Sequence, residues 1–222
     1  MIKKVTLPFL VLILTGALSV VRGQSEYPFQ NTALPIEQRV VNILSLMTLE
    51  EKIACLNTGT AVPRLRIPNI GGAEGLHQLV VKGGPGQRDP VPTTSFALTL
   101  GMGATWNPAL MRRAGEAQSY EARYAQQSSK YKKTVLVNWL NVDLARDPRW
   151  GRYEESYSED PLLTATMATA FIRGLQGDDS KYWRAAALLK HYLANSNETT
   201  RTRSSSDFDQ RLFREYTPSR FA

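Results

Sequence analysis

The chain has 222 residues, of which 42% are hydrophobic and 21% charged, so it can bury a sizeable core. Its formal net charge is +7, but Lys3, Lys4 and Arg22 lie at the N-terminus, and the remaining excess does not indicate a nucleic-acid-binding protein. Cys55 is the only cysteine, which excludes an intrachain disulfide and a cysteine-based metal site.

The first 23 residues have the pattern of a secretory signal peptide. Lys3 and Lys4 form a basic start, residues 7–21 are mostly apolar, and Gly23 suits cleavage on its C-terminal side. The alternative is a membrane anchor, but the apolar stretch is shorter than the roughly 20 residues a span requires. We expect a secreted or periplasmic protein that has no membrane contact after signal cleavage.

The segment 24–34 is polar and irregular, and we interpret it as a linker. Pro35 stands where a helix can begin, and apolar residues follow it at helical spacing as far as Leu46. Thr48 and Glu51 form a capping box, which predicts a second helix from residue 49 to about residue 56.

Strand and helix patterns alternate along the rest of the chain. Strands are predicted at 67–74, 96–101, 134–144 and 185–192, and helices at 108–125, 161–175 and from about residue 209 onward. Asp160 and Pro161 give the middle helix a good N-cap and first residue, and Gly177 lies just past its end. This order predicts a parallel sheet with helical crossovers, with its site at the C-terminal ends of the strands.

The most distinctive segment is the 145–152 loop, which reads Ala-Arg-Asp-Pro-Arg-Trp-Gly-Arg and leads into an acidic stretch. A solvated charged surface has no need of the tryptophan, the glycine or the proline. A binding loop at the mouth of a rigid scaffold uses all of them.

Four polar residues stand at the ends of predicted strands or in the loops after them: Glu74, Arg152, Lys190 and His191. Together they supply one acceptor, two cations and one imidazole, a set suited to the vicinal hydroxyls of a sugar. The aromatic candidates for an apolar ring face beside them are Trp139, Trp150 and Tyr153. The alternatives are structural: Arg152 could pair with Glu154, Glu155 or Glu159 to hold its loop, and Lys190 and His191 could simply be solvated.

The order of the motifs resembles glycoside hydrolase family 3, the β-glucosidase and β-xylosidase family. The matching segments are Thr-Leu-Glu-Glu-Lys at 48–52, Gly-Ala-Glu-Gly-Leu-His at 72–77, Ala-Thr-Trp-Asn-Pro at 104–108, Arg-Asp-Pro-Arg-Trp-Gly-Arg at 146–152, Glu-Ser-Tyr-Ser-Glu-Asp-Pro at 155–161, and Lys190-His191 with Asn195, Glu198 and Arg201. The resemblance implies an α/β fold, with residues 35–222 forming an incomplete (β/α)8 barrel, the N-terminal portion of the family's barrel domain.

The resemblance also implies the activity, that of a retaining exo-acting β-glycosidase acting on a β-linked oligosaccharide or glycoside, with no cofactor and no metal. It makes Glu74, Arg152, Lys190 and His191 the glycone-binding residues. Many of the family's β-glucosidases have Asp where this chain has Glu74, which favours a pentose or other compact glycone here.

The family's nucleophile Asp lies in a Ser-Asp-Trp-like segment and its acid/base Glu lies further on, so both are expected beyond Ala222. Ser206-Asp207-Phe208 is not that segment, because Asp207 and Asp209 precede a helix and suit capping. The alternatives are a non-catalytic sugar-binding remnant and an inactive truncated gene product. A dinucleotide enzyme is disfavoured, because Gly101 and Gly103 lack the third glycine of the fingerprint.

Overall fold

A computed structural model describes residues 26–56, 61–82, 91–131, 135–195 and 197–216. The predicted signal peptide lies outside the described residues. The chain divides into two compact units, Met1–Ser45 and Leu46–Ala222.

In the first unit a short 3-10 helix, η1 (Pro28–Gln30), precedes helix α1 (Ile36–Leu46). The Phe29 amide donates to Asn42 Oδ1 over 3.0 Å, and Arg39 Nε donates to the Phe29 carbonyl over 2.7 Å. Part of the segment interpreted as a linker is therefore hydrogen-bonded to the helix that follows it, and that helix begins where Pro35 predicts.

The second unit contains the predicted alternation of strands and helices. Its elements are α2 (Leu49–Cys55), η2 (Pro63–Leu65), β1 (Gly72–Glu74), α3 (Thr99–Gly103), α4 (Pro108–Gln127), β2 (Val137–Asn141), η3 (Tyr153–Glu155), α5 (Pro161–Gln176), β3 (Ala186–Lys190) and α6 (Gln210–Tyr216). Local capping sets several of the boundaries. The Thr48–Glu51 capping box begins α2, Asn107 Oδ1 accepts from the Leu110 amide to begin α4, and Asp160 Oδ1 accepts from the Leu163 amide to begin α5.

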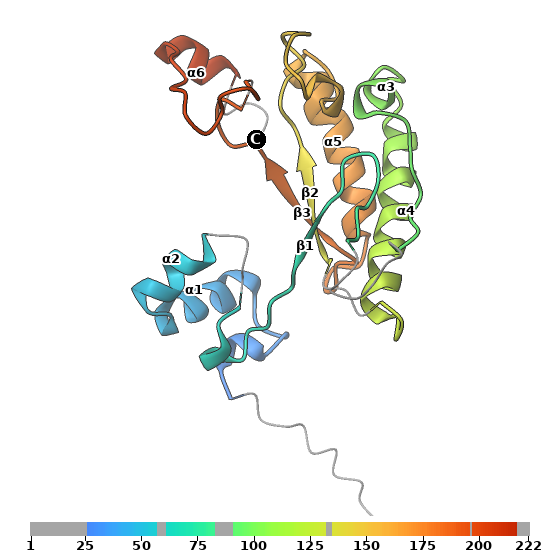
Figure 1. Cartoon of the computed structure of the whole chain (residues 1–222). Helices are drawn as coiled ribbons and strands as arrows, with labels where there is room; N and C mark the ends of the chain where they lie inside the picture. The colour runs from blue at the N-terminus through green and yellow to red at the C-terminus, as the bar shows by residue number, and fades with distance from the viewer. Residues whose placement is uncertain (1–25, 57–60, 83–90, 132–134, 196, 217–222) are drawn as a thin grey trace, which may run out of the picture. The chain divides into compact units, whose positions relative to one another are not determined.

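The three strands form one parallel sheet in the order β1-β2-β3. Helices α4 and α5 each connect one strand to the next, and they lie side by side along the sheet (Figure 1). The predicted parallel sheet with helical crossovers is confirmed. Parallel pairing brings the C-terminal ends of all three strands to one edge.

The strand predicted at 96–101 is wrong, because helix α3 covers Thr99–Gly103. β1 pairs directly with β2, so no strand stands between them in the part of the chain described. The cause is a tertiary contact. A Cβ atom on Gly103 would lie 1.9 Å from the Tyr157 carbonyl oxygen, so the backbone of α3 packs directly against the 156–158 segment.

One face of the sheet packs against α4 and α5, since side chains alternate between the two faces of a strand. Ala73 and Leu140 point toward the helices and join a core with the fully buried side chains of Met111 and Phe171. Most of the apolar burial in the second unit lies in this layer.

The opposite face carries Glu74, Trp139 and Leu188 in one row across the three strands. The indole of Trp139 lies against Gly72, where a Cβ atom would come within 2.6 Å of the ring nitrogen. Leu188 is 48% exposed on this face. Trp139 is therefore the neighbour of Glu74 on this face.

A buried amide pair connects α4 to the strand ends. Gln118 Nε2 donates to Asn138 Oδ1 over 2.9 Å and to the Gly75 carbonyl over 3.2 Å, and both side chains are fully buried. Asn138 Nδ2 in turn donates to the Val135 carbonyl over 2.9 Å. This network fixes the backbone immediately after Glu74.

Replacing Gln118 by Leu is expected to lower the free energy of unfolding by about 1–3 kcal/mol, because it leaves two buried acceptors without their donor. Urea unfolding monitored by circular dichroism measures the change. Gln127→Leu at the exposed end of α4 is the matched control and should shift stability by no more than about 0.5 kcal/mol. Equal effects of the two substitutions would contradict the role assigned to Gln118.

Candidate functional site

The predicted site residues meet at the C-terminal edge of the sheet. Glu74 is the last residue of β1, Asn141 the last of β2 and Lys190 the last of β3, with His191 directly after it. Asn141 and Lys190 are register partners, two residues along the strands beyond the row that contains Glu74 and therefore on the same face of the sheet.

Lys190 reaches back across β2 to Glu74. Its Nζ lies 2.5 Å from Glu74 Oε2, and the two side chains are 14% and 37% exposed. The pair joins the two outer strands of the sheet above Trp139. It also leaves the Glu74 carboxylate partly open to a ligand.

The 145–152 loop has a fixed shape. The Ala145 amide donates to the Ser158 carbonyl over 2.9 Å, and the Trp150 amide donates to the Asp147 carbonyl over 3.0 Å. Trp150 is only 5% exposed, and its Nε1 donates to Glu198 Oε1 over 3.4 Å. Trp150 therefore holds the loop in place and does not present a ring face to a ligand.

Arg152 forms a two-bond ion pair with Glu155. Arg152 Nε lies 2.8 Å from Glu155 Oε1 and Nη2 lies 2.5 Å from Oε2, with both side chains less than one-fifth exposed. The structural alternative raised for Arg152 is thus realised with Glu155. Arg152 has a second contact, because its Nη1 lies 3.2 Å from His191 Nε2.

The charges of this pair are strongly fixed. The hydrogen bond to Glu155 raises the pKa of Arg152 above its ordinary value. Burial disfavours ionisation of Glu155, but hydrogen bonds from Arg152 and Asn141 and attraction to Arg152 and Lys190 outweigh it, so the pKa of Glu155 is lowered. The site therefore holds a carboxylate and a guanidinium in charged form.

His191 contacts three side chains. Its Nδ1 lies 2.7 Å from Asp143 Oδ2 and 3.0 Å from the Asn195 side-chain nitrogen, while its Nε2 faces Arg152. Asp143 stands two residues after the end of β2, and its side chain is 3% exposed. The peptide bond between Lys190 and His191 is cis.

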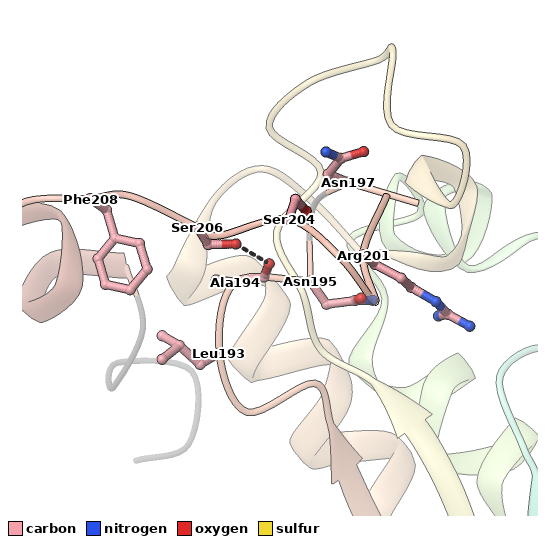
Figure 2. Close-up of a pocket in the computed structure, with 8 residues that line it drawn as sticks. All are labelled: Leu193, Ala194, Asn195, Asn197, Arg201, Ser204, Ser206 and Phe208. Carbon is pink, nitrogen blue, oxygen red and sulfur yellow. Dashed lines mark hydrogen bonds between the residues drawn. The ribbon is translucent and has the colours of Figure 1, made fainter. Parts of the chain in front are cut away.

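A polar pocket adjoins His191 on the loop that follows β3. It has a volume of about 320 Å³ and is lined by Leu193, Ala194, Asn195, Asn197, Arg201, Ser204, Ser206 and Phe208 (Figure 2). Asn195 belongs both to the pocket wall and to the contacts of His191. The pocket therefore opens next to the imidazole, with amide, hydroxyl and guanidinium groups on its wall.

Glu198 links the loop after β3 to the 145–152 loop. Its carboxylate lies 3.8 Å from Arg152 Nη1 and 3.3 Å from Arg201 Nη1, in addition to its contact with Trp150. The two loops that follow β2 and β3 are thus tied together beside Arg152.

The structure brings all four predicted residues together, as the pairs Glu74–Lys190 and Arg152–His191. Lys190 and His191 are consecutive residues, so the two pairs lie next to each other at the end of β3. Sequence analysis missed Asn141 and Asp143, which it assigned to a predicted strand. Their signal was polarity, since two short polar side chains lie near the C-terminal end of a mostly apolar run.

In the described parts of the chain, no cluster of three His, Cys, Asp or Glu side chains could hold a metal ion. No helix among those same residues is long and apolar enough to cross a membrane.

Comparison with known proteins agrees with this arrangement. Residues 42–218 match the glycosyl hydrolase family 3 N-terminal domain. The chain is 36% identical, over 94% of its length, to a xylan 1,4-beta-xylosidase of Xylanibacter ruminicola, and 37% identical, over 78% of its length, to a beta-glucosidase of Rhizobium radiobacter. A solved family 3 exo-beta-xylosidase, XlnD, in complex with a xylobiose aziridine probe superposes with a TM-score of 0.69 at 27% identity over 87% of this chain.

The chain spans only part of these proteins: 25% of the Xylanibacter xylosidase, 20% of the Rhizobium glucosidase and 26% of XlnD. Its parallel strands, crossover helices and strand-end site are those of a partial (β/α)8 barrel. The chain therefore belongs to glycoside hydrolase family 3, the family of β-xylosidases and β-glucosidases, and carries part of its N-terminal domain.

Proposed function

We propose that this chain supplies the glycone-binding part of a secreted, retaining, exo-acting β-glycosidase. The observation that carries the proposal is the convergence of Glu74, Arg152, Lys190 and His191 at one end of the sheet. Sites of (β/α)8 enzymes lie at this end of the strands. Because the chain spans about a quarter or less of its relatives, the activity belongs to the whole protein.

The site suits the hydroxyls of a sugar ring. Glu74 is a carboxylate acceptor that is 37% exposed, and Lys190 is a donor beside it. Arg152 and His191 add nitrogen groups on the neighbouring loops. Trp139 lies next to Glu74 and supplies an apolar surface for a ring face.

We assign no catalytic carboxylate to the described residues. Glu155 and Glu198 are bound to arginines, Asp209 Oδ1 accepts from the Leu212 amide over 2.7 Å, and Asp207 accepts from Ser205 over 3.3 Å. A retaining enzyme needs a nucleophile and an acid/base about 5–5.5 Å apart. We propose that both come from parts of the whole protein other than these residues.

A xylose-type glycone is our preferred substrate, with glucose as the alternative. Glu74 is longer than an aspartate and leaves less room beyond the ring. Relatives named as xylosidases include the Xylanibacter protein and beta-D-xylosidases of Arabidopsis thaliana. The signal-peptide pattern of residues 1–23 supports secretion.

The test is calorimetric titration of the 222-residue chain with xylose and with glucose. Glu74→Gln should weaken binding by about 10-fold or more, because hydrogen bonds to a charged group contribute about 1.5–3 kcal/mol. Glu159→Gln, at an exposed position outside the strand ends, is the matched control and should leave affinity unchanged. Binding of neither sugar would refute the glycone assignment.

A companion assay separates the enzyme from a non-catalytic sugar-binding module. The chain alone should not hydrolyse aryl β-xylosides, whereas a full-length protein containing it should. A full-length protein that binds xylose but never hydrolyses the glycoside would favour the binding module.

A further inference from the structure

Five residues at and after the strand ends form a closed ring of hydrogen bonds, which the backbone amide of Asp143 completes. Asp143 contacts His191, His191 contacts Arg152, Arg152 contacts Glu155, Asn141 Nδ2 donates to Glu155 Oε2 over 3.3 Å, and Asn141 Oδ1 accepts from the Asp143 amide over 2.7 Å. We infer that Asp143 is the positioning residue of this ring and that it holds His191 as the neutral imidazole protonated on Nδ1.

The tautomer follows from the partner of Nε2. A guanidinium nitrogen can only donate a hydrogen bond, so Nε2, at 3.2 Å from Arg152 Nη1, must be the unprotonated acceptor. The proton of the neutral ring then lies on Nδ1, which donates to Asp143 Oδ2 at 2.7 Å. The Asn195 carboxamide at 3.0 Å accommodates this proton when turned so that its oxygen faces Nδ1.

Asp143 is itself held in one orientation. Its Oδ1 accepts from the His191 backbone amide over 3.4 Å while its Oδ2 accepts from the ring, so one carboxylate grips both ends of the same residue. The Asp143 side chain is 3% exposed. It does not face the solvent-open part of the site, and it acts on a ligand only through His191.

These contacts fix the orientation of the Arg152 guanidinium. Arg152 donates hydrogen bonds from Nε and Nη2 to the Glu155 carboxylate, and from Nη1 to His191 Nε2. Arg152 is therefore fixed on two sides. Its importance for glycone recognition rests on the proposed function, but the tautomer itself does not.

The test is long-range 1H–15N NMR of the histidine rings in the full 222-residue chain at about pH 8, where an ordinary imidazole is neutral. His77 and His191 are the only histidines. The ring signals that disappear in His191→Gln are therefore those of His191. We expect a protonated Nδ1 and an unprotonated Nε2 in His191. An Nε2-protonated His191 in the unsubstituted chain overturns the inference without any further variant.

Asp143→Asn should reverse the tautomer. The His191 amide holds the Asn oxygen, which leaves the Asn NH2 facing Nδ1 and moves the ring proton to Nε2, opposite the N–H of Arg152. Xylose affinity should fall by about 10-fold in the same variant. Asp178→Asn is the control and should change neither readout, because the Asp178 side chain is 81% exposed and follows the C-terminal end of α5.

The two proposals fail separately. If Asp143→Asn reverses the His191 tautomer but the unsubstituted chain binds no sugar, the positioning role is supported and the glycone site is refuted. If a folded Asp143→Asn variant keeps the His191 tautomer of the unsubstituted chain, the positioning role is overturned even where xylose binds.

Discussion

Replacing Gly174 by Ala should lower the free energy of unfolding by about 3 kcal/mol, because α4 and α5 cross in backbone contact there. A Cβ atom on Gly174 would lie 2.0 Å from the Arg112 carbonyl oxygen, and one on Gly115 would lie 2.1 Å from the Phe171 carbonyl oxygen. Each new methyl group meets the partner helix's backbone, which cannot rotate away as a side chain can. The helices must separate, and the core beneath them opens.

Gly101→Ala is the matched control, since it is also a glycine inside a helix. The nearest atom to its added Cβ is the Ala97 Cβ at 3.9 Å, an ordinary contact. This substitution should raise stability by about 0.5–1 kcal/mol through helix propensity alone. Urea unfolding followed by circular dichroism measures both variants. A Gly174→Ala variant as stable as Gly101→Ala would show that the crossing is looser than the structure has it.

The sequence predicts the helices of the second unit well, because their ends are fixed by neighbouring residues. Asp160 and Gly177 bracket α5, and Asn107 begins α4. The segment 96–101 fails for the opposite reason. Its alternating apolar residues fit a strand, but close packing of Gly103 against Tyr157 favours a helical turn, and residue 157 is far away in sequence.

The same distinction applies to the site. The βα pattern predicts that Glu74, Arg152, Lys190 and His191 follow strands, and parallel pairing then brings them to one edge. It does not predict which cation meets which carboxylate, since that depends on register and rotamer. Lys190 lies two residues beyond the row of Glu74 and reaches back to it, whereas Arg152 pairs with Glu155 three residues further along its own segment.

Replacing Arg152 by Met should reduce stability at pH 7 by about 3 kcal/mol, because it leaves the carboxylate of Glu155 unpaired. Glu155 is 17% exposed, and burial is the largest single influence on its ionisation. In the unsubstituted chain the pKa of Glu155 is lowered, so its contribution to stability is present above its unfolded pKa and is lost as the pH falls.

The variant should show the opposite pH dependence. Without the guanidinium, burial prevails and raises the pKa of Glu155 above its unfolded value, so its contribution is present at low pH and is lost as the pH rises. The stability gap between Arg152→Met and the unsubstituted chain should therefore narrow from pH 7 to about pH 5, as measured by urea unfolding. Glu155→Gln added to Arg152→Met should recover much of the stability lost in Arg152→Met.

Arg149→Met is the matched control. It removes an ion pair whose arginine is 89% exposed, and it should lower the free energy of unfolding by no more than about 1 kcal/mol at either pH. A gap in Arg152→Met that stays constant with pH would mean that Glu155 remains ionised without its partner, and that Lys190 and Asn141 are sufficient to hold its charge.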